Sequence, residues 1–401
     1  MGQLEIEKIN ETTFVLQMGP HHPATHGVLK LYCEFEGERV LRIIPDVGYL
    51  HRGVEKLAEN KTYPVAMTIT DRLDYISSMT NNIGYCIAIE RLMGIEPTQR
   101  AKFIRTMVSE LTRLSSHLLW LATHALDIGA MTVFLYAFRE REQILTFFEK
   151  ICGARLTVSY PRIGGVRVDV EQAVLDEIYG FTDTMLKRID DYEELLTENR
   201  IWIARTKGIG IISAEEALSL GLTGPVLRGS GVYYDIRKLE PYDAYEEVNF
   251  EVPLGENGDT YDRYLCRIQE MRQSVFIIKQ CIEKMPEGQV ISEQSPEIDM
   301  PFQGKREILA DGSLWNGFVS FTDKKNEIMP KGEFYSAIEA PKGELGFYIV
   351  SDGSGRPYRM RVRAPSFIHI SAIPKLCEGH LLADVITIIG TLDIVMGEAD
   401  R

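Results

Sequence analysis

Long segments with helical periodicity, most of them followed by a glycine or a proline, constrain the fold of this chain more than any other feature. Between residues 68 and 92, apolar side chains recur about every 3.6 residues, and Gly94 follows as a stop signal. Further segments of this kind are 97–128, 133–152, 170–200 and 261–285. Long helices joined by short connections predict a helix bundle at the centre of the molecule.

Strand patterns flank the predicted helices. The first 50 residues alternate short β-rich runs with turns, and residues 358–363 alternate strictly, with Arg359, Arg361 and Arg363 on one face. That face is either solvated or meets an acidic partner chain. The chain is therefore predicted to be α+β, with these regions: an N-terminal β-rich domain (1–62), a helix bundle (63–200), an irregular and strand insertion (201–260), a further bundle helix (261–290) and a strand-rich C-terminal region with a terminal helix (291–401).

Charge and cysteine usage exclude several classes of function. The 401 residues carry a net charge of −14, which argues against nucleic acid as a partner. The longest mainly apolar stretch, 114–126, is too short to span a membrane, and the first residues do not resemble a signal peptide. Six cysteines without any CxxC argue against a zinc or iron–sulfur site held by this chain alone and predict free thiols in a reducing compartment.

Three histidines, His21, His22 and His26, lie within six residues in a loop that is rich in proline and glycine. Imidazole is a common metal ligand, but Pro23 breaks the helical spacing that would bring two of the rings to one face. Three alternatives remain at this stage. They are a metal site, solvated histidines without a role, and a histidine that donates a proton to a bound ligand.

Three other charged segments are candidates for a site. The first consists of residues 52–55 (RGVE), which are followed after 16 residues by residues 72–77 (RLDYIS). The second is the end of the sequence, residues 393–401 (DIVMGEADR). In the third, Asp127 lies in an apolar helix end, where a carboxylate needs a partner and the nearby His124 is a natural one. Taken singly, each segment is compatible with an ordinary structural role.

Together, these segments resemble the two signatures of nickel–iron hydrogenase large subunits. In that family an RGxE is followed after 16 residues by RxCGxC, and the chain closes with DPCxxCxxH or DPCxxCxxR. The four positions of the nickel-binding cysteines carry other residues in this chain: Asp74, Ser77, Val395 and Glu398. Because nickel in those enzymes is held by four thiolates, the resemblance excludes hydrogen activation and implies the same scaffold without its metal.

With these replacements the chain resembles the quinone-site subunit of respiratory complex I, the proton-pumping NADH–quinone oxidoreductase. The similar segments run from about residue 14 to residue 401 and include GPHHPATHGVL, YLHRGVEKL, DRLDYISSM, HALDIGAM, LRGSGVYYDIRK and EAPKGELGFYIVSDGSGRPYR. The resemblance implies an α+β fold like that of a hydrogenase large subunit without its metal. It also implies NADH:quinone oxidoreductase activity within an assembled respiratory complex, with ubiquinone or menaquinone as the acceptor.

The same resemblance implies roles for five residues. His26 occupies the family position that bonds one side of the quinone headgroup, Tyr75 the position that bonds the other carbonyl, and Asp127 the carboxylate partner of that histidine. His51 and Arg52 belong to the loop that lines a [4Fe-4S] cluster held by a neighbouring subunit. Reduction of a quinone requires two electrons and two protons, and tyrosine and imidazolium can donate hydrogen bonds and then protons to its oxygens. The vacated nickel pocket is therefore expected to hold the headgroup.

One position departs from the family pattern. Thr157 stands in the stretch after Gly153-Ala154-Arg155, where the family often has a histidine that couples proton uptake to the terminal cluster. Threonine does not titrate. The resemblance therefore predicts a weaker pH dependence of the redox potential of that cluster.

The implied partners are the other subunits of complex I. They include the subunit with the terminal [4Fe-4S] cluster, the C-type subunit and the membrane subunit that forms the quinone entry, with one copy of this chain per complex and no nucleic acid. The implied location is peripheral, on the cytoplasmic side of the inner membrane. Alternatives are an equivalent subunit of a ferredoxin- or other-donor quinone oxidoreductase, a membrane-bound hydrogenase, and a structural subunit without chemistry.

Overall fold

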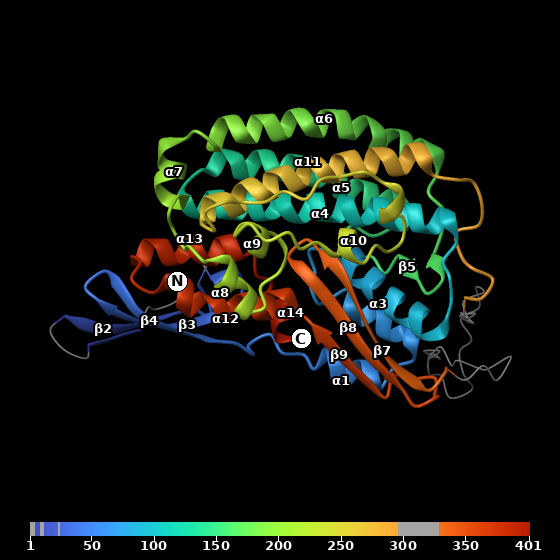
Figure 1. Cartoon of the computed structure of the whole chain (residues 1–401), viewed down its shortest axis with the longest axis horizontal. Helices are drawn as coiled ribbons and strands as arrows, with labels where there is room; N and C mark the ends of the chain where they lie inside the picture. The colour runs from blue at the N-terminus through green and yellow to red at the C-terminus, as the bar shows by residue number, and fades with distance from the viewer. Residues whose placement is uncertain (1–4, 9–11, 23–24, 296–328) are drawn as a thin grey trace, which may run out of the picture.

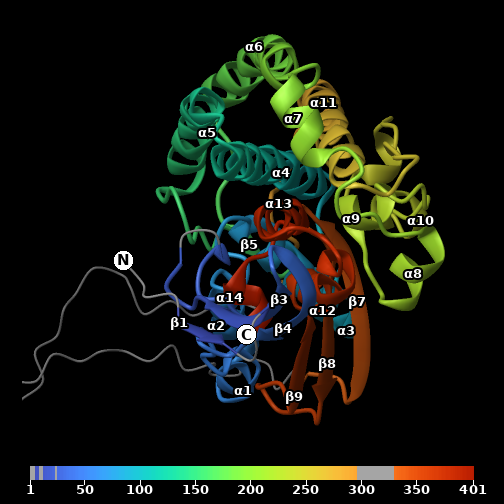
Figure 2. The ribbon, with the colours of Figure 1, turned by 90° about the vertical axis from the view of Figure 1, so that its left-hand side faces the viewer.

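A layer of long helices forms the upper half of the molecule in Figure 1. The computed structural model describes residues 5–8, 12–22, 25–295 and 329–401. Helix α4 is buried along nearly its whole length. Two of the other long helices, α5 and α11, pack against it, and α6 packs against those two, as Figure 2 shows end-on. The four helices are α4 (Gln99–Ile128), α5 (Met131–Cys152), α6 (Gln172–Leu196) and α11 (Thr260–Lys284) (Figure 1).

The lower half contains two antiparallel sheets. The first has the order β1-β2-β3-β4 and packs against C-terminal helices, whereas the second has the order β7-β8-β9 and packs against α3. The strands are β1 (Glu5–Lys8), β2 (Thr13–Met18), β3 (Lys30–Glu36), β4 (Arg39–Asp46), β7 (Gly332–Ala340), β8 (Gly343–Ser351) and β9 (Arg359–Arg363). Long helices combined with small antiparallel sheets confirm the α+β fold class.

The helix expected over residues 68–92 is interrupted, which corrects the prediction. Helix α2 (Tyr63–Thr70) ends before a turn at 71–77, and α3 (Ser78–Met93) begins after it. In the turn, Oδ1 of Asp74 accepts the backbone N–H of Ile76 at 3.1 Å, and Oδ2 accepts the hydroxyl of Ser77 at 2.7 Å. Aspartate side chains that bond nearby backbone groups compete with helical hydrogen bonds. The break therefore places residues 72–77 at a helix junction.

The expectation of strands within residues 201–260 is wrong. All of these residues are described, and they form short helices and loops instead: α7 (Arg200–Thr206), α8 (Ala214–Ser219), α9 (Gly224–Arg228), α10 (Ile236–Leu239) and a 3-10 turn at Tyr245–Glu247. Side-chain caps explain several starts, since Asn199, Ser213 and Asp235 each accept a backbone N–H of the following helix.

Short elements complete the chain. They are α1 (Val54–Glu59) and the two-residue strands β5 (Pro161–Arg162) and β6 (Gly165–Val166). After β9 come three helices, rather than the single terminal helix expected: α12 (Pro365–Cys377), α13 (Leu382–Leu392) and α14 (Met396–Asp400). All five residues of α14 are buried, so the end of this sequence is packed into the fold.

A buried network of charges joins the helix layer to the β7–β9 sheet. Glu110 of α4 accepts hydrogen bonds from Arg237 at 3.1 Å and from the hydroxyl of Tyr245 at 2.6 Å. Arg228 donates to Glu339 of β7 at 2.7 Å. Each of these side chains is at most 2% exposed. Buried charges are tolerated only when they are paired, so the network requires the layers to keep one arrangement.

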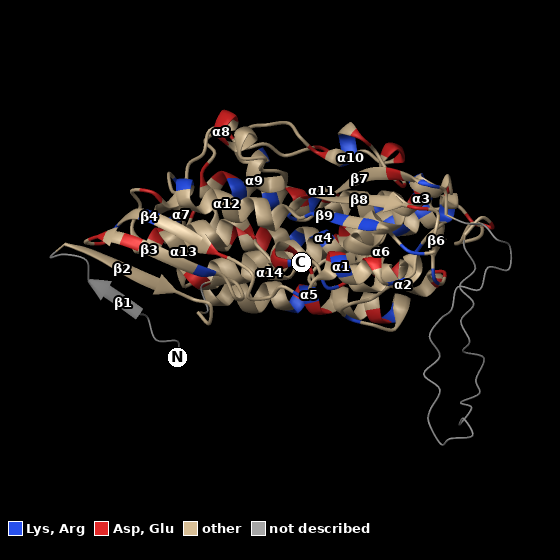
Figure 3. Cartoon of the chain, turned by 90° about the horizontal axis from the view of Figure 1, so that it is seen from below, with Lys and Arg blue, Asp and Glu red and all other residues tan. Residues whose placement is uncertain are grey.

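Charged residues of both signs are spread over the described part of the chain. Lys and Arg are interspersed with Asp and Glu over the ribbon in Figure 3, where β9 lies beside α1. No helix within the described ranges is both long and apolar enough to cross a membrane. The six cysteines are free thiols, of which Cys152 alone is partly exposed.

Candidate functional site

His26 and Asp127 form an ion pair although they lie in distant parts of the sequence. His26 belongs to the loop between β2 and β3, and Asp127 to the last turn of α4, which Gly129 closes with a left-handed φ of 104°. Nε2 of His26 lies 3.1 Å from Oδ2 of Asp127, and the two side chains are 15% and 20% exposed. The pair is thus held in place by the fold and still open to solvent.

His124, the nearer candidate partner for Asp127, plays a different part. It is fully buried between the rings of Trp120 and Trp202, with both centroid distances at 5.4 Å. Neither ring nitrogen has a hydrogen-bond partner in the described part of the chain. Burial lowers the pKa of His124 to about 3, so this histidine is neutral near pH 7.

Tyr75 projects from the break between α2 and α3. Its side chain is 39% exposed, and its hydroxyl makes no hydrogen bond to any described residue. Burial of part of the ring raises the pKa of Tyr75; the charge of Asp74 raises it further, whereas Lys342 and Arg52 lower it. A tyrosine that stays protonated and unpaired can donate its hydroxyl to a ligand.

The first turn of α14 contacts both the His26 loop and the Tyr75 segment. A Cβ added to Gly397 would lie 2.4 Å from the carbonyl oxygen of Leu73 and 3.0 Å from Cδ1 of Tyr75. A Cβ added to Gly27 would lie 3.3 Å from Cγ of Met396. The two predicted headgroup ligands are therefore brought to the same end of α14 by close backbone packing.

The four positions of the former nickel thiolates are all deeply buried. Asp74, Ser77, Val395 and Glu398 are each at most 3% exposed. Burial raises the pKa of Glu398 to about 7, and the nearby charge of Asp74 acts in the same direction. No three His, Cys, Asp or Glu side chains among the described residues are arranged to hold a metal ion.

The loop with His51 and Arg52 is fastened to the end of the sequence. Nδ1 of His51 lies 2.7 Å from the carbonyl oxygen of Asp400, and Arg52 donates to the carbonyl of Gly397 at 2.6 Å. The carboxylate of Asp400 accepts the backbone N–H of Leu50 at 2.7 Å. This loop is thereby held against the same short helix that contacts Tyr75.

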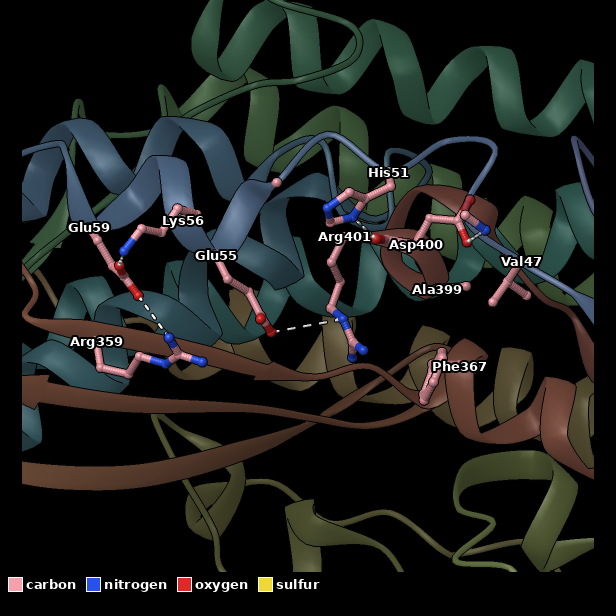
Figure 4. Close-up of a pocket in the computed structure, with 12 residues that line it drawn as sticks. Val47, His51, Glu55, Lys56, Glu59, Arg359, Phe367, Ala399, Asp400 and Arg401 are labelled. Atoms are coloured by element: carbon pink, nitrogen blue, oxygen red, sulfur yellow. Dashed lines mark hydrogen bonds and ion pairs between the residues drawn. The ribbon is translucent and has the colours of Figure 1, made fainter.

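An open pocket of about 360 Å³ lies beside this loop (Figure 4). His51 lines it, together with α1, β9, Phe367 of α12 and the end of α14. His26, Tyr75 and Asp127 do not line it. The pocket thus adjoins the loop expected to face the partner's cluster and is distinct from the two predicted headgroup ligands.

The arginines of β9 pair within the chain. Arg359 lies 3.6 Å from Glu59 and Arg361 lies 3.9 Å from Glu55, both on α1, while more than half of each arginine side chain is exposed. Arg363 lies 3.5 Å from Glu344 of the adjacent strand β8. Carboxylates of the same chain therefore meet these charges, and the Arg359–Glu59 pair lines the pocket in Figure 4.

Comparison with known proteins identifies the family. A family model described as the 49 kDa subunit of respiratory-chain NADH dehydrogenase matches residues 127–401. The chain is 82% identical to a D-type subunit of the NADH-quinone oxidoreductase of Thermodesulfovibrio yellowstonii over the full length of both. The chain belongs to the family of this 49 kDa subunit.

More distant members of the family extend the match. The chain is 49% identical to the D-type subunit of the NADH-quinone oxidoreductase of Geobacter sulfurreducens over the whole of both chains. It is 51% identical to the mitochondrial NADH-ubiquinone oxidoreductase 49 kDa subunit of Neurospora crassa, over 97% of this chain and 80% of the relative. The resemblance inferred from the motifs is thereby confirmed at the level of the family.

Within this member of the 49 kDa subunit family, the structure adds Lys342, which sequence reasoning missed as a site residue. Lys342 lies in the turn between β7 and β8, and only 1% of it is exposed. Its Nζ reaches one of the former thiolate positions, 3.1 Å from Oδ2 of Asp74. One sequence feature could have indicated this residue: the lysine lies in EAPKGELG, a segment that resembles the family, directly after a strand with apolar residues.

Proposed function

We propose that this chain forms the quinone-reduction site of a proton-translocating NADH:quinone oxidoreductase. The family assignment supports the complex, since its relatives are named as subunits of NADH-quinone or NADH-ubiquinone oxidoreductases. The observation that carries the site is the His26–Asp127 pair at 3.1 Å, together with the unpaired hydroxyl of Tyr75. Both donors adjoin the start of α14 through Gly27 and Gly397.

The proposed chemistry uses these side chains as donors to the two quinone oxygens. A quinone that gains two electrons and two protons becomes a quinol, and negative charge accumulates on both oxygens as the electrons arrive. Tyr75 donates a hydrogen bond to one oxygen and His26 to the other, and each then transfers a proton. Asp127 keeps the imidazole of His26 oriented through the 3.1 Å contact between Oδ2 and Nε2.

The electrons come from a [4Fe-4S] cluster held by a neighbouring subunit, near the loop of His51 and Arg52. That loop is partly exposed and fastened to Asp400 and Gly397, so it presents a defined surface. The further partners are the C-type subunit and the membrane subunit that provides the quinone entry, with one copy of this chain per complex. The assembly would place the chain on the cytoplasmic side of the inner membrane as a peripheral subunit.

Two substitutions in the assembled complex test this function. Tyr75→Phe removes one donor and keeps the ring, and His26→Ala removes the other. We expect each to lower the kcat of reduction of a short-chain ubiquinone or menaquinone analogue at least about tenfold, because one proton donor is lost. Electron transfer to a water-soluble acceptor that does not require the quinone site should be retained.

Matched controls are available in the chain. Tyr179→Phe removes a surface hydroxyl on α6 that bonds Glu283, and His21→Ala removes an exposed histidine of the same loop as His26. Both controls should keep normal quinone reduction. If Tyr75→Phe and His26→Ala also kept it, the assignment of the site would be wrong.

A further inference from the structure

A buried lysine occupies the space between the two segments that bind nickel in hydrogenases. Nζ of Lys342 lies 3.1 Å from Oδ2 of Asp74, which belongs to the first segment. It lies 3.6 Å from Oδ2 of Asp393, which begins the second segment. It also donates to Oγ of Ser116 on α4 at 2.9 Å. A single ammonium group thus links three parts of the fold at the position of the lost metal.

The surroundings of Lys342 favour its charged form. Burial alone would lower the pKa of Lys342, but the carboxylates of Asp393 and Asp74 outweigh this effect and raise it. An ammonium group has three N–H donors, and three oxygen-bearing side chains face it here. Lys342 is therefore a fixed positive charge in a site from which water is largely excluded, where a charge acts strongly on its neighbours.

The ion-pair partner of this charge is adjacent in sequence to the proposed proton donor. Asp74, the closest ion-pair partner of Lys342, directly precedes Tyr75 in the sequence. Lys342 and Arg52 both lower the pKa of Tyr75 and oppose the effects of burial and of Asp74. The charged groups that face Tyr75 or Lys342 from all neighbouring elements are Asp74, Arg52, Asp393 and Glu398.

We propose that Lys342 is a positioning residue for quinone reduction, whose buried ammonium pairs with Asp74 and Asp393 and so stabilises negative charge at the adjacent Tyr75. The inference rests on the proposed role of Tyr75 as a proton donor. When Tyr75 gives its proton to the quinone oxygen, negative charge is left on the phenolic oxygen. A fixed cation nearby lowers the free energy of that state and so speeds the transfer.

The test compares Lys342→Met with the wild type in the assembled complex. Methionine keeps an unbranched side chain of similar length and removes the charge. We expect kcat for reduction of a short-chain quinone analogue to fall about tenfold or more, while KM changes less than about threefold. The alkaline limb of the pH–rate profile should move to higher pH, because Tyr75 holds its proton more tightly without the cation.

Two further variants separate the effect of charge from an effect on folding. Lys342→Met combined with Asp393→Asn removes one positive and one negative group, so the buried pocket keeps its net charge while the cation is still absent. This double variant should assemble and show the same loss of kcat. Lys375→Met, at a lysine whose side chain is 54% exposed on α12, is the matched control and should behave as the wild type.

The outcomes distinguish this inference from the proposed function. If Tyr75→Phe abolishes quinone reduction but the alkaline limb stays in place in Lys342→Met and in the double variant, the role of Lys342 is overturned and that of Tyr75 stands. A rise in KM alone would also overturn it, since it indicates only a structural role. If Tyr75→Phe leaves quinone reduction unchanged, both the proposed site and the role of Lys342 fail.

Discussion

His26 and Asp127 are 101 residues apart in the sequence, yet Nε2 of His26 lies 3.1 Å from Oδ2 of Asp127. Asp127→Asn keeps the shape of the side chain but removes the negative charge that faces the imidazole of His26. We therefore expect quinone reduction by the assembled complex to fall at least about tenfold, because the proposed donor loses the partner that orients it. Asp183→Asn, at an exposed carboxylate on α6, is the control. Equal rates of quinone reduction for the wild type and Asp127→Asn would contradict the proposed role of the pair.

Thr157 combines a strained backbone with the loss of a titratable group. Its φ is 50°, a region that β-branched residues rarely adopt and that histidine and asparagine tolerate better. We expect Thr157→His to steepen the pH dependence of the redox potential of the neighbouring cluster, measured by potentiometric titration of the complex across pH. Thr157→Asn relieves the same backbone strain without adding a titratable group. It should therefore leave the pH dependence of the redox potential shallow. A steep slope in the wild type would refute this expectation.

Gly397 permits the close packing of α14 on the Tyr75 segment. Any side chain there would place a Cβ 2.4 Å from the carbonyl oxygen of Leu73, which is backbone and cannot move aside alone. We expect Gly397→Ala to reduce the thermal stability of the subunit within the complex and to lower quinone reduction together. Gly180→Ala, in α6 with open space around it, should instead be neutral or stabilising by up to about 1 kcal/mol. Thermal unfolding of the purified complex, with loss of this subunit as the readout, checks both.

Glu398 makes the C-terminal segment sensitive to pH. Its pKa is raised to about 7 in the folded chain, so the folded state binds a proton more tightly than the unfolded state. The stability that protonated Glu398 contributes to the folded state is therefore fully present below the ordinary glutamate pKa. It is lost as the pH rises through about 7. Hydrogen exchange of residues 395–401 in the assembled complex should accelerate between about pH 5 and pH 8, beyond the intrinsic change with pH. In Glu398→Gln this additional acceleration should disappear, and an unchanged profile would contradict the assignment.

Glu110 holds the buried charge network together. Glu110→Gln leaves Arg237 and Arg113 without their shared carboxylate in a water-free site. Removing one partner of a buried ion pair typically destabilises a protein by about 3–5 kcal/mol. We expect a clear fall in the amount of subunit recovered in the complex and in its thermal stability. Glu177→Gln, at a half-exposed ion pair on α6, should change stability by less than about 1 kcal/mol.

Local sequence patterns predicted the long helices well, because helix periodicity and stop signals act over a few neighbouring residues. The segment expected to end at Ile128 and the one expected to end at Cys152 do so, each followed by a glycine in the left-handed region. Patterns failed at the break of 71–77, where Asp74 side-chain bonds replace helical ones despite continuing apolar periodicity. They also failed in 201–260, where short capped helices carry too few residues to show a period.

The sequence by itself determined the family, the long helices and the identity of the residues at the former thiolate positions, since each of these is written in contiguous or closely spaced motifs. The family resemblance implied that Asp127 partners His26, but local sequence favoured His124, three residues away, and the tertiary structure places Asp127 against His26. It also decided that Lys342, from a strand connection, meets Asp74 and Ser116. Such contacts depend on how whole elements pack to bury apolar surface and pair buried charges, and local propensity carries no information about partners so distant in the chain.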